Sequence, residues 1–206
     1  MGVESVFFDP PLQSRIEPAV PYFVVVGTIE PRKNLEFLLH VWRHWTSSGK
    51  AARARLVVVG RRGWENENII NMLERSAGLA SSVIEVTSLS DIGMIMLLRG
   101  AAALLAPSMV EGFGLPIAES LTLGVPVIAS DIGVFREVGG RFVEYIHPLD
   151  GRGWIAAFEE YARPNSERRN RQLALLRDYK PETWNSHVEK VETLLASRDS
   201  AGDRNK

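Results

Sequence analysis

Two short apolar runs, each ended by a glycine and followed by a helical pattern, limit this chain to one broad fold class. The runs are Tyr22-Phe-Val-Val-Val-Gly27 and Arg55-Leu-Val-Val-Val-Gly60. Consecutive β-branched residues without polar alternation are typical of strands that are buried on both faces. Such strands occur in parallel sheets covered by helices on both sides, so the two runs predict an α/β domain.

The rest of the chain continues this alternation of strands and helices. After Asn34, which can cap a helix, leucines and tryptophans recur at helical spacing up to Trp45. Parallel strands joined by right-handed crossovers need units of roughly 30 residues, which is the spacing found here. We therefore predict a Rossmann-like, doubly wound parallel sheet of about six strands. The expected strands cover residues 22–27, 55–60, 83–86, 102–106, 125–130 and 142–146, and the expected helices follow Asn34, cover Ile69 to Ala77, follow the N-cap Ser90, and cover 116–123, 154–162, 166–179 and 181–196.

The two ends of the chain differ in composition from this domain. Residues 1–21 contain four prolines, which remove backbone donors and disfavour regular structure. We interpret residues 1–21 as a linker or lead-in and residues 22–196 as one Rossmann-like domain with C-terminal helices. Residues 197–206 lack large apolar side chains and are predicted to form a disordered tail.

Composition excludes several classes of function. The chain has 24 Lys and Arg against 25 Asp and Glu, a net charge of −1, so a nucleic-acid partner is not favoured. Without cysteine it has neither disulfides nor thiolate metal ligands. No apolar run is long enough to span a membrane, and we expect a cytoplasmic protein.

One loop at the carboxyl end of the predicted sheet has the composition of an anion site. In open parallel sheets ligands bind beyond the carboxyl ends of the strands. The segment after the fourth strand holds Gly112 and Gly114, then Pro116 at the expected first position of a helix whose N–H groups would face a phosphate. Glu119, in the expected first helical turn, suits a ribose diol, and Glu111 suits a sugar hydroxyl. An acidic residue there also stabilises the helix dipole without any ligand, and that alternative stays open.

The loop after the first strand carries two cations, Arg32 and Lys33. Strands one and four are neighbours in the usual doubly wound order, so this loop would face the glycine-containing loop across one crevice. The two cations could neutralise a diphosphate bound there, or they could be solvated loop charges. Neither a Gly-x-Gly-x-x-Gly nor a P-loop sequence follows Gly27, which disfavours dinucleotide and P-loop sites.

These segments carry a resemblance to a known family. From about Tyr22 to Trp184 the chain resembles the nucleotide-sugar-binding, C-terminal half of family 4 retaining glycosyltransferases of the GT-B fold, also called glycosyl transferases group 1. The similar segments are Val-Gly27-Thr-Ile-Glu-Pro-Arg32-Lys33-Asn34, Val-Val-Gly60, Ser90-Asp91, Pro107-Ser108, Glu111 to Glu119, Gly124 to Asp131, Arg136-Glu137-Val138 and Pro148-Leu-Asp150.

The resemblance implies roles for individual residues. Lys33, helped by Arg32, would bind the donor diphosphate and stabilise its departure, while Glu111 would contact the transferred sugar and Glu119 the ribose. The family needs neither a metal nor another cofactor, because Arg and Lys supply the positive charge. Thr28 stands where many members have Arg, and Thr87 where many have Gly. The remaining donor-site residues implied are Gly27, Thr28, Ser88, Leu89 (the last two near the base), Gly112, Phe113, Gly114 and Leu115.

The resemblance also implies partners. Complete members add an N-terminal acceptor domain, which is missing here, so the chain is expected to bind a GDP-, UDP- or other nucleoside-diphosphate hexose without transferring the sugar. GDP-mannose and polysaccharide biosynthesis are the first expectations. The alternatives are a stand-alone nucleotide-sugar-binding module and a relative of GT-B sugar-nucleotide epimerases. Self-association through the exposed interface and a peripheral contact of residues 166–180 with the inner face of the membrane also stay open.

Overall fold

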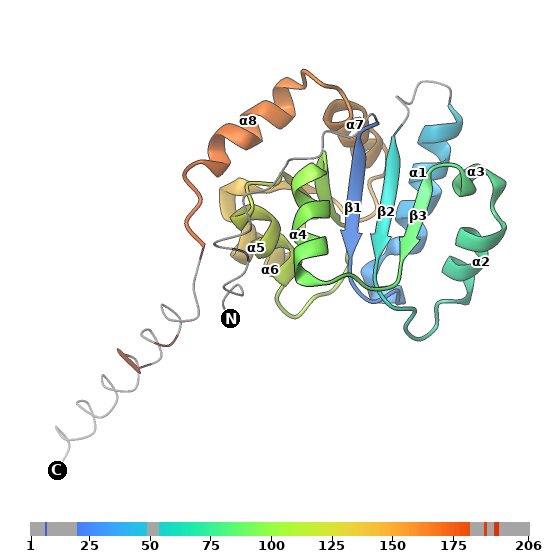
Figure 1. The fold of residues 1–206 in the computed structure, drawn as a ribbon, viewed down its shortest axis with the longest axis horizontal. Coiled ribbons are helices and arrows are strands. Elements are labelled where there is room, and N and C mark those ends of the chain that lie inside the picture. Colours follow the sequence, from blue (N-terminus) through green and yellow to red (C-terminus); the bar gives the residue numbers. More distant parts are fainter. Residues whose placement is uncertain (1–6, 8–19, 49–53, 182–187, 189–191, 194–206) are drawn as a thin grey trace, which may run out of the picture.

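A computed structural model describes residues 7, 20–48, 54–181, 188, 192 and 193 of the chain. Its centre is a six-stranded sheet in the order β3-β2-β1-β4-β5-β6, in which every pair of neighbours is parallel (Figure 1). The predicted fold class is confirmed, and so is the adjacency of strands one and four. The strands are β1 (Tyr22–Val26), β2 (Arg55–Val59), β3 (Val83–Val86), β4 (Ala103–Ala106), β5 (Val127–Ser130) and β6 (Glu144–Ile146).

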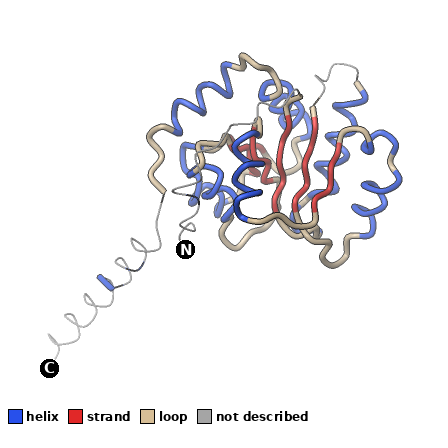
Figure 2. Tube along the Cα trace, viewed as in Figure 1, coloured by secondary structure: helices blue, strands red, loops and turns tan. Residues whose placement is uncertain are grey.

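Helices cover both faces of the sheet (Figure 2). Ser90 caps its helix as predicted, because its Oγ accepts the N–H of Gly93 at 3.2 Å. The helices are α1 (Leu35–Ser47), α2 (Glu67–Arg75), α3 (Ala77–Ala80), α4 (Asp91–Gly100), α5 (Leu115–Thr122), α6 (Gly133–Gly139), α7 (Gly151–Tyr161) and α8 (Glu167–Leu176), with 3-10 turns at η2 (Pro31–Lys33) and η3 (Gly140–Phe142).

Several boundaries differ from the prediction. The single helix expected from Ile69 to Ala77 is broken at Ser76, whose backbone is extended, and continues as α3. The last strand begins at Glu144 because η3 occupies the residues before it. The short helix α6 was not predicted. Most of the helix expected over residues 181–196, the lead-in and the tail lie outside the described residues.

Alternate residues of the central strand support two separate hydrophobic clusters. Phe23 of β1 packs with the aromatic side chains of α1 and α7, such as Trp42 and Phe158, whose ring centroids are 5.3 Å apart. Val24 faces the opposite side, where α4, α5 and α6 pack and where Phe7 from the expected lead-in is also buried. Both clusters therefore hold β1, and the loop that follows β1 starts from a well-buried strand.

Two basic residues of α8 contact the body of the domain. Arg168 pairs with Glu144 of β6, and the Nε of Arg169 donates to the carbonyl of Ala102 at 3.0 Å. These two side chains hold α8 against the ends of the strands, while Arg171, Arg177 and Lys180 are exposed, so the membrane contact of residues 166–180 stays a prediction. Among the helices that the structure describes, none is long and apolar enough to cross a membrane.

Candidate functional site

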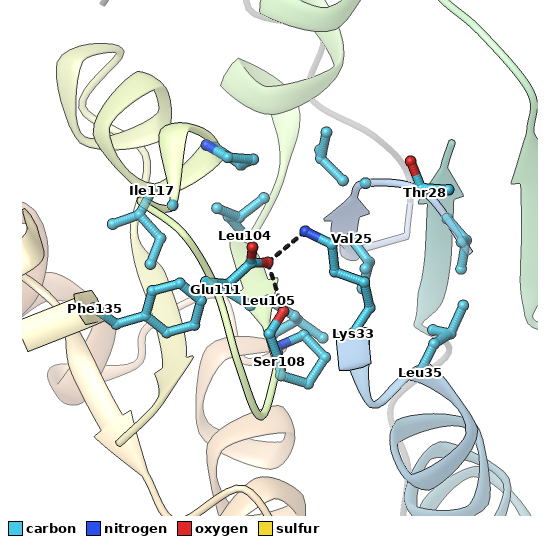
Figure 3. Close-up of a pocket in the computed structure, with 17 residues that line it drawn as sticks. Val25, Thr28, Lys33, Leu35, Leu104, Leu105, Ser108, Glu111, Ile117 and Phe135 are labelled. Carbon is cyan, nitrogen blue, oxygen red and sulfur yellow. Dashed lines mark hydrogen bonds and ion pairs between the residues drawn. The ribbon is translucent and has the colours of Figure 1, made fainter. Parts of the chain in front are cut away.

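A pocket opens where β1 and β4 end, between the two loops that the sequence pointed to (Figure 3). Its empty space, counting the part open to solvent, is about 460 Å³. The walls are largely apolar, with Leu104, Ile117 and Phe135 among them. The lining residues with polar side chains are Thr28, Lys33, Ser108 and Glu111, and the last three point toward one another.

The loop after β1 is shaped so that Lys33 returns over the end of its own strand. Gly27 has a φ of +144°, and a Cβ added there would lie 3.3 Å from both Cε and Nζ of Lys33. The chain then enters η2 at Pro31, where the N–H of Lys33 donates to the carbonyl of Glu30 at 3.1 Å. The missing side chain of Gly27 therefore leaves the room that the lysine occupies.

Asn34 does not act as the predicted helix cap. Its backbone is left-handed, with a φ of 55°, and its side chain makes no capping hydrogen bond to α1. The Nδ2 group donates instead to the carbonyls of Pro107, at 3.1 Å, and Pro148, at 3.0 Å. Asn34 thus connects the loop after β1 to the loops after β4 and β6, through a buried hydrogen bond to Pro107 and a partly buried one to Pro148.

Glu111 joins the two predicted loops. Its carboxylate forms an ion pair with Lys33, accepts from Arg32 Nη1 at 2.9 Å and accepts from Ser108 Oγ at 2.9 Å. Burial by itself would raise the pKa of the Glu111 carboxyl group. The ion pair with Lys33 and the hydrogen bonds from Ser108 and Arg32 outweigh that effect, so the pKa lies below its ordinary value. Glu111 therefore occupies the position of an anion between two cations.

Arg32 has a second acidic neighbour that the sequence prediction did not single out. Its Nη2 lies 2.5 Å from Oε1 of Glu30, a side chain that is buried. The other oxygen of Glu30 accepts from the indole Nε1 of Trp64 at 3.0 Å. The position of Glu30 two residues before the predicted cation pair could have identified it, whereas nothing in the sequence pointed to Trp64.

The glycine-containing loop leads into α5 much as expected. Gly114 adopts a left-handed φ of +92°, and a Cβ there would lie 3.0 Å from the ring of Phe135. Helix α5 begins at Leu115, so Pro116 is its second residue and not its first. Within the described part of the chain, no hydrogen-bond acceptor is found for the backbone N–H groups of Gly112, Phe113, Gly114 or Leu115. These groups are available to an anion at the start of the helix.

Other predicted residues lie elsewhere. Glu119 is the fifth residue of α5 and not in its first turn, so the helix-dipole alternative loses its basis. It is half-buried and does not line the pocket. Ser88 and Leu89 follow β3, two strands away from β1, and are exposed. The structure thus brings together Gly27, Thr28, Arg32, Lys33, Glu111 and Gly114, and leaves the residues expected near the base apart from them.

The comparison with known families agrees with this architecture. The family described as "Glycosyl transferases group 1" matches residues 12–159, which is most of the chain. The chain belongs to this family. The match begins inside the expected lead-in and ends before Trp184, so its limits differ from those of the resemblance seen in the sequence.

Known relatives of this glycosyl transferases group 1 domain are much longer proteins. The "Serotype-specific mannosyltransferase WbdA" of Escherichia coli is 33% identical over 159 residues, which cover 74% of this chain and 19% of the relative. The "O-antigen chain mannosyltransferase RfbU" of Salmonella typhimurium is 30% identical over 138 residues, which cover 67% of this chain and 37% of the relative. The chain therefore spans a minor part of the curated relatives that it matches.

Solved structures share the fold of the glycosyl transferases group 1 domain. A sucrose-phosphate synthase from Thermosynechococcus elongatus aligns with a TM-score of 0.68 at 21% identity, over 97% of this chain and 52% of that chain. The structure titled "OtsA apo structure" aligns with a TM-score of 0.69 at 14% identity, over 85% and 45% of the two chains. At these identities the likeness concerns the fold alone, and it agrees with the predicted Rossmann-like α/β sheet.

The metal prediction has no direct test in the structure. Among the residues that the structure describes, no group of three His, Asp or Glu side chains could hold a metal ion. Metal-independent action thus stays a prediction. The positive charge of the pocket lining comes from Lys33, and Arg32 lies beside it in contact with Glu111.

Proposed function

We propose that this domain binds the donor of a glycosyl transfer, a nucleoside diphosphate sugar. The diphosphate would lie between Arg32 and Lys33 on one side and the N–H groups at the start of α5 on the other. The observation that supports this proposal is the carboxylate of Glu111, which is held by both cations as an internal anion. A site that binds one anion with an arginine and a lysine has the chemistry to bind another.

In this proposal the diphosphate exchanges places with Glu111. When the bond between the sugar and the diphosphate breaks, negative charge develops on the leaving phosphate oxygen. Arg32 and Lys33 stabilise that charge, and the pocket excludes part of the surrounding water. Glu111, released from the cations, becomes free to accept a hydrogen bond from a hydroxyl group of the transferred sugar. Glu119 is proposed to accept hydrogen bonds from the ribose.

The finer assignment rests on the family and on the names of relatives. Both WbdA and RfbU are called mannosyltransferases, which favours GDP-mannose as the donor to test first. We propose a retaining hexosyl transfer of family 4 type, in polysaccharide biosynthesis, to a saccharide acceptor that a second domain holds. Because transfer requires donor and acceptor in one geometry, this chain alone is expected to bind the donor and to transfer nothing.

Calorimetry tests the donor site. The chain is titrated with GDP, UDP, ADP and GDP-mannose in the presence of EDTA, and the same titrations are made with Lys33→Ala and Glu119→Ala variants. We expect metal-free binding of one nucleotide and a loss of about tenfold or more in Lys33→Ala. Arg163→Ala is the matched control, since Arg163 pairs with Glu160 on the surface at α7 and its loss also removes one cation.

Two results would contradict the donor site. The first is a chain that binds none of the four nucleotides. The second is a control variant that weakens binding as much as Lys33→Ala does, because binding would then follow net charge and not the site. Loss of binding in Lys33→Ala but not in Glu119→Ala would support the diphosphate part and remove Glu119 from the proposal.

A further inference from the structure

A glutamate carboxylate contacts each of the two terminal nitrogens of the Arg32 guanidinium group, and the two glutamates differ in their surroundings. Glu111 lies on the loop after β4, lines the pocket and contacts Nη1 at 2.9 Å. Glu30 lies on the same loop as Arg32, is only 6% exposed and contacts Nη2 at 2.5 Å. One partner therefore faces the ligand space, and the other lies buried beside the arginine.

The position of Glu30 is itself fixed from the neighbouring loop. Its Oε2 accepts from Nε1 of Trp64 at 3.0 Å, although the Trp64 side chain is otherwise 58% exposed. Because the Trp64 ring is mostly exposed, apolar burial contributes little at this position, and the hydrogen bond of its one polar atom indicates its role. A buried carboxylate in turn needs donors, because leaving it without partners is costly.

The loop that carries Trp64 is joined to the loop of Glu30 through Ile29. The N–H of Ile29 donates to the carbonyl of Arg61 at 2.9 Å, and the N–H of Gly63 donates to the carbonyl of Ile29 at 3.0 Å. A Cβ on Gly63 would lie 2.7 Å from Cγ2 of Thr28 and 3.1 Å from the carbonyl oxygen of Ile29, so a larger residue there would require the Thr28 side chain to move. The indole N–H is thus presented to Glu30 by a backbone with little freedom.

We propose that Glu30 and Trp64 are positioning residues that hold the guanidinium of Arg32 toward the donor diphosphate. This inference rests on the donor site proposed above. Glu30 is the permanent partner of Arg32, and Glu111 is the partner that the diphosphate replaces. Arg32 then meets the ligand already oriented, which lowers the entropy lost on binding.

The direction in which nucleotide affinity changes when Glu30 is removed shows whether Glu30 positions Arg32 or acts only through its negative charge. Removing an acidic side chain beside a cation that binds anions should strengthen anion binding if only the charge counts. If Glu30 acts by orienting Arg32, its removal weakens binding in spite of the lost negative charge. The two accounts therefore predict opposite changes in the dissociation constant of the nucleotide.

The test is a double-mutant cycle on the whole chain, with GDP, UDP and ADP as the probes. We expect Glu30→Ala to weaken binding of the preferred nucleotide about tenfold when Arg32 is present, and to cause no further weakening in the Arg32→Ala background. Trp64→Phe keeps an exposed ring but removes the N–H, and we expect about threefold weaker binding from it. Glu85→Ala is the control, because Glu85 also binds an arginine, Arg62 at 2.8 Å, but does not contact Arg32.

Each outcome bears on the inference. Equal or tighter binding by Glu30→Ala, or the same weakening with and without Arg32, would overturn it while leaving the donor site intact. A wild-type chain that binds no nucleotide would overturn the donor site and the inference with it. Should Glu30→Ala fail to fold, as thermal denaturation would show, unchanged binding by Trp64→Phe alone would still contradict the role of the pair.

Discussion

Replacing Gly60 by alanine tests how closely the ends of β1 and β2 approach one another beside the site. A Cβ at this position would lie 1.9 Å from the carbonyl oxygen of Gly27 and 2.7 Å from its carbonyl carbon. Real Cβ contacts shorter than 3.0 Å are essentially absent, and the obstacle is backbone and not a flexible side chain. The backbone at Gly27 or the backbone at Gly60 must therefore move by about 1 Å in a close-packed region.

The cost of that movement can be estimated. Forcing one extra carbon into a packed interior typically destabilises a protein by about 1–3 kcal/mol. We expect the upper end, about 3 kcal/mol, because Gly27 also donates to the carbonyl of Val59 at 2.9 Å and supports Lys33. For a domain of this size the melting temperature should fall by about 6–12 °C.

Thermal and urea denaturation followed by circular dichroism measure this effect. Gly133→Ala is the matched control, since Gly133 is the first residue of α6 and a Cβ there meets nothing within 4 Å. We expect its melting temperature to be unchanged or slightly higher, because alanine favours helix more than glycine does. If Gly60→Ala melted within about 2 °C of the wild type, the close approach of the two strand ends would be refuted.

Three further changes test the loops around the pocket. Glu111→Gln should bind a nucleoside diphosphate about fivefold more tightly, because Arg32 and Lys33 lose their internal anion; weaker binding in calorimetry would contradict the exchange of partners. The stability that the Glu111 charge adds should also disappear in acid. Because the pKa of this carboxyl group is lower in the folded state than in the unfolded state, the charge contributes its full stability above the unfolded pKa. That contribution is lost as the pH falls through the folded pKa. The difference in melting temperature between wild type and Glu111→Gln should accordingly shrink from pH 6 to about pH 3, and a constant difference would refute the assignment. Asn34→Ala should lower the unfolding free energy by about 2–3 kcal/mol in urea denaturation, since it leaves the carbonyls of Pro107 and Pro148 without their donor; an unchanged free energy would show that water replaces the amide.

The strands and their order were accessible from the sequence because their signals are local. Burial on both faces leaves uninterrupted runs such as the one before Gly27, and the adjacency of strands one and four is that of the usual doubly wound order. That adjacency placed the loop of Lys33 opposite the loop of Glu111, whereas the ion pair between the two side chains was not predicted. Helix α6, by contrast, has seven residues and both begins and ends with glycine, so it carries too little periodicity to be recognised.

The features of the site that the sequence predicted wrongly or missed depend mostly on contacts between residues that are far apart in the sequence. The amide of Asn34 binds carbonyls 73 and 114 residues further along the chain, and no local pattern distinguishes this use from a helix cap. Glu119 moved out of the first turn because α5 begins one residue earlier than the proline rule suggested. The contact of Trp64 with Glu30 depends on the close approach of two loops, which only the folded backbone defines.

Ion pairs connect two acidic and two basic side chains beside the pocket, namely Glu30, Arg32, Glu111 and Lys33. These pairs restrict which amino-acid substitutions the site can accept. Replacing Arg32 leaves Glu30 without its ion-pair partner, and replacing Glu111 leaves Lys33 without its ion-pair partner, in both cases in a partly buried place. Single substitutions at Arg32 or Glu111 are thus costly where the donor is proposed to bind, and we expect change at these two positions to be accompanied by a compensating substitution at a partner. Trp64 is tied to the same restriction through Glu30, so a surface tryptophan that looks replaceable should vary together with a buried acid on another loop.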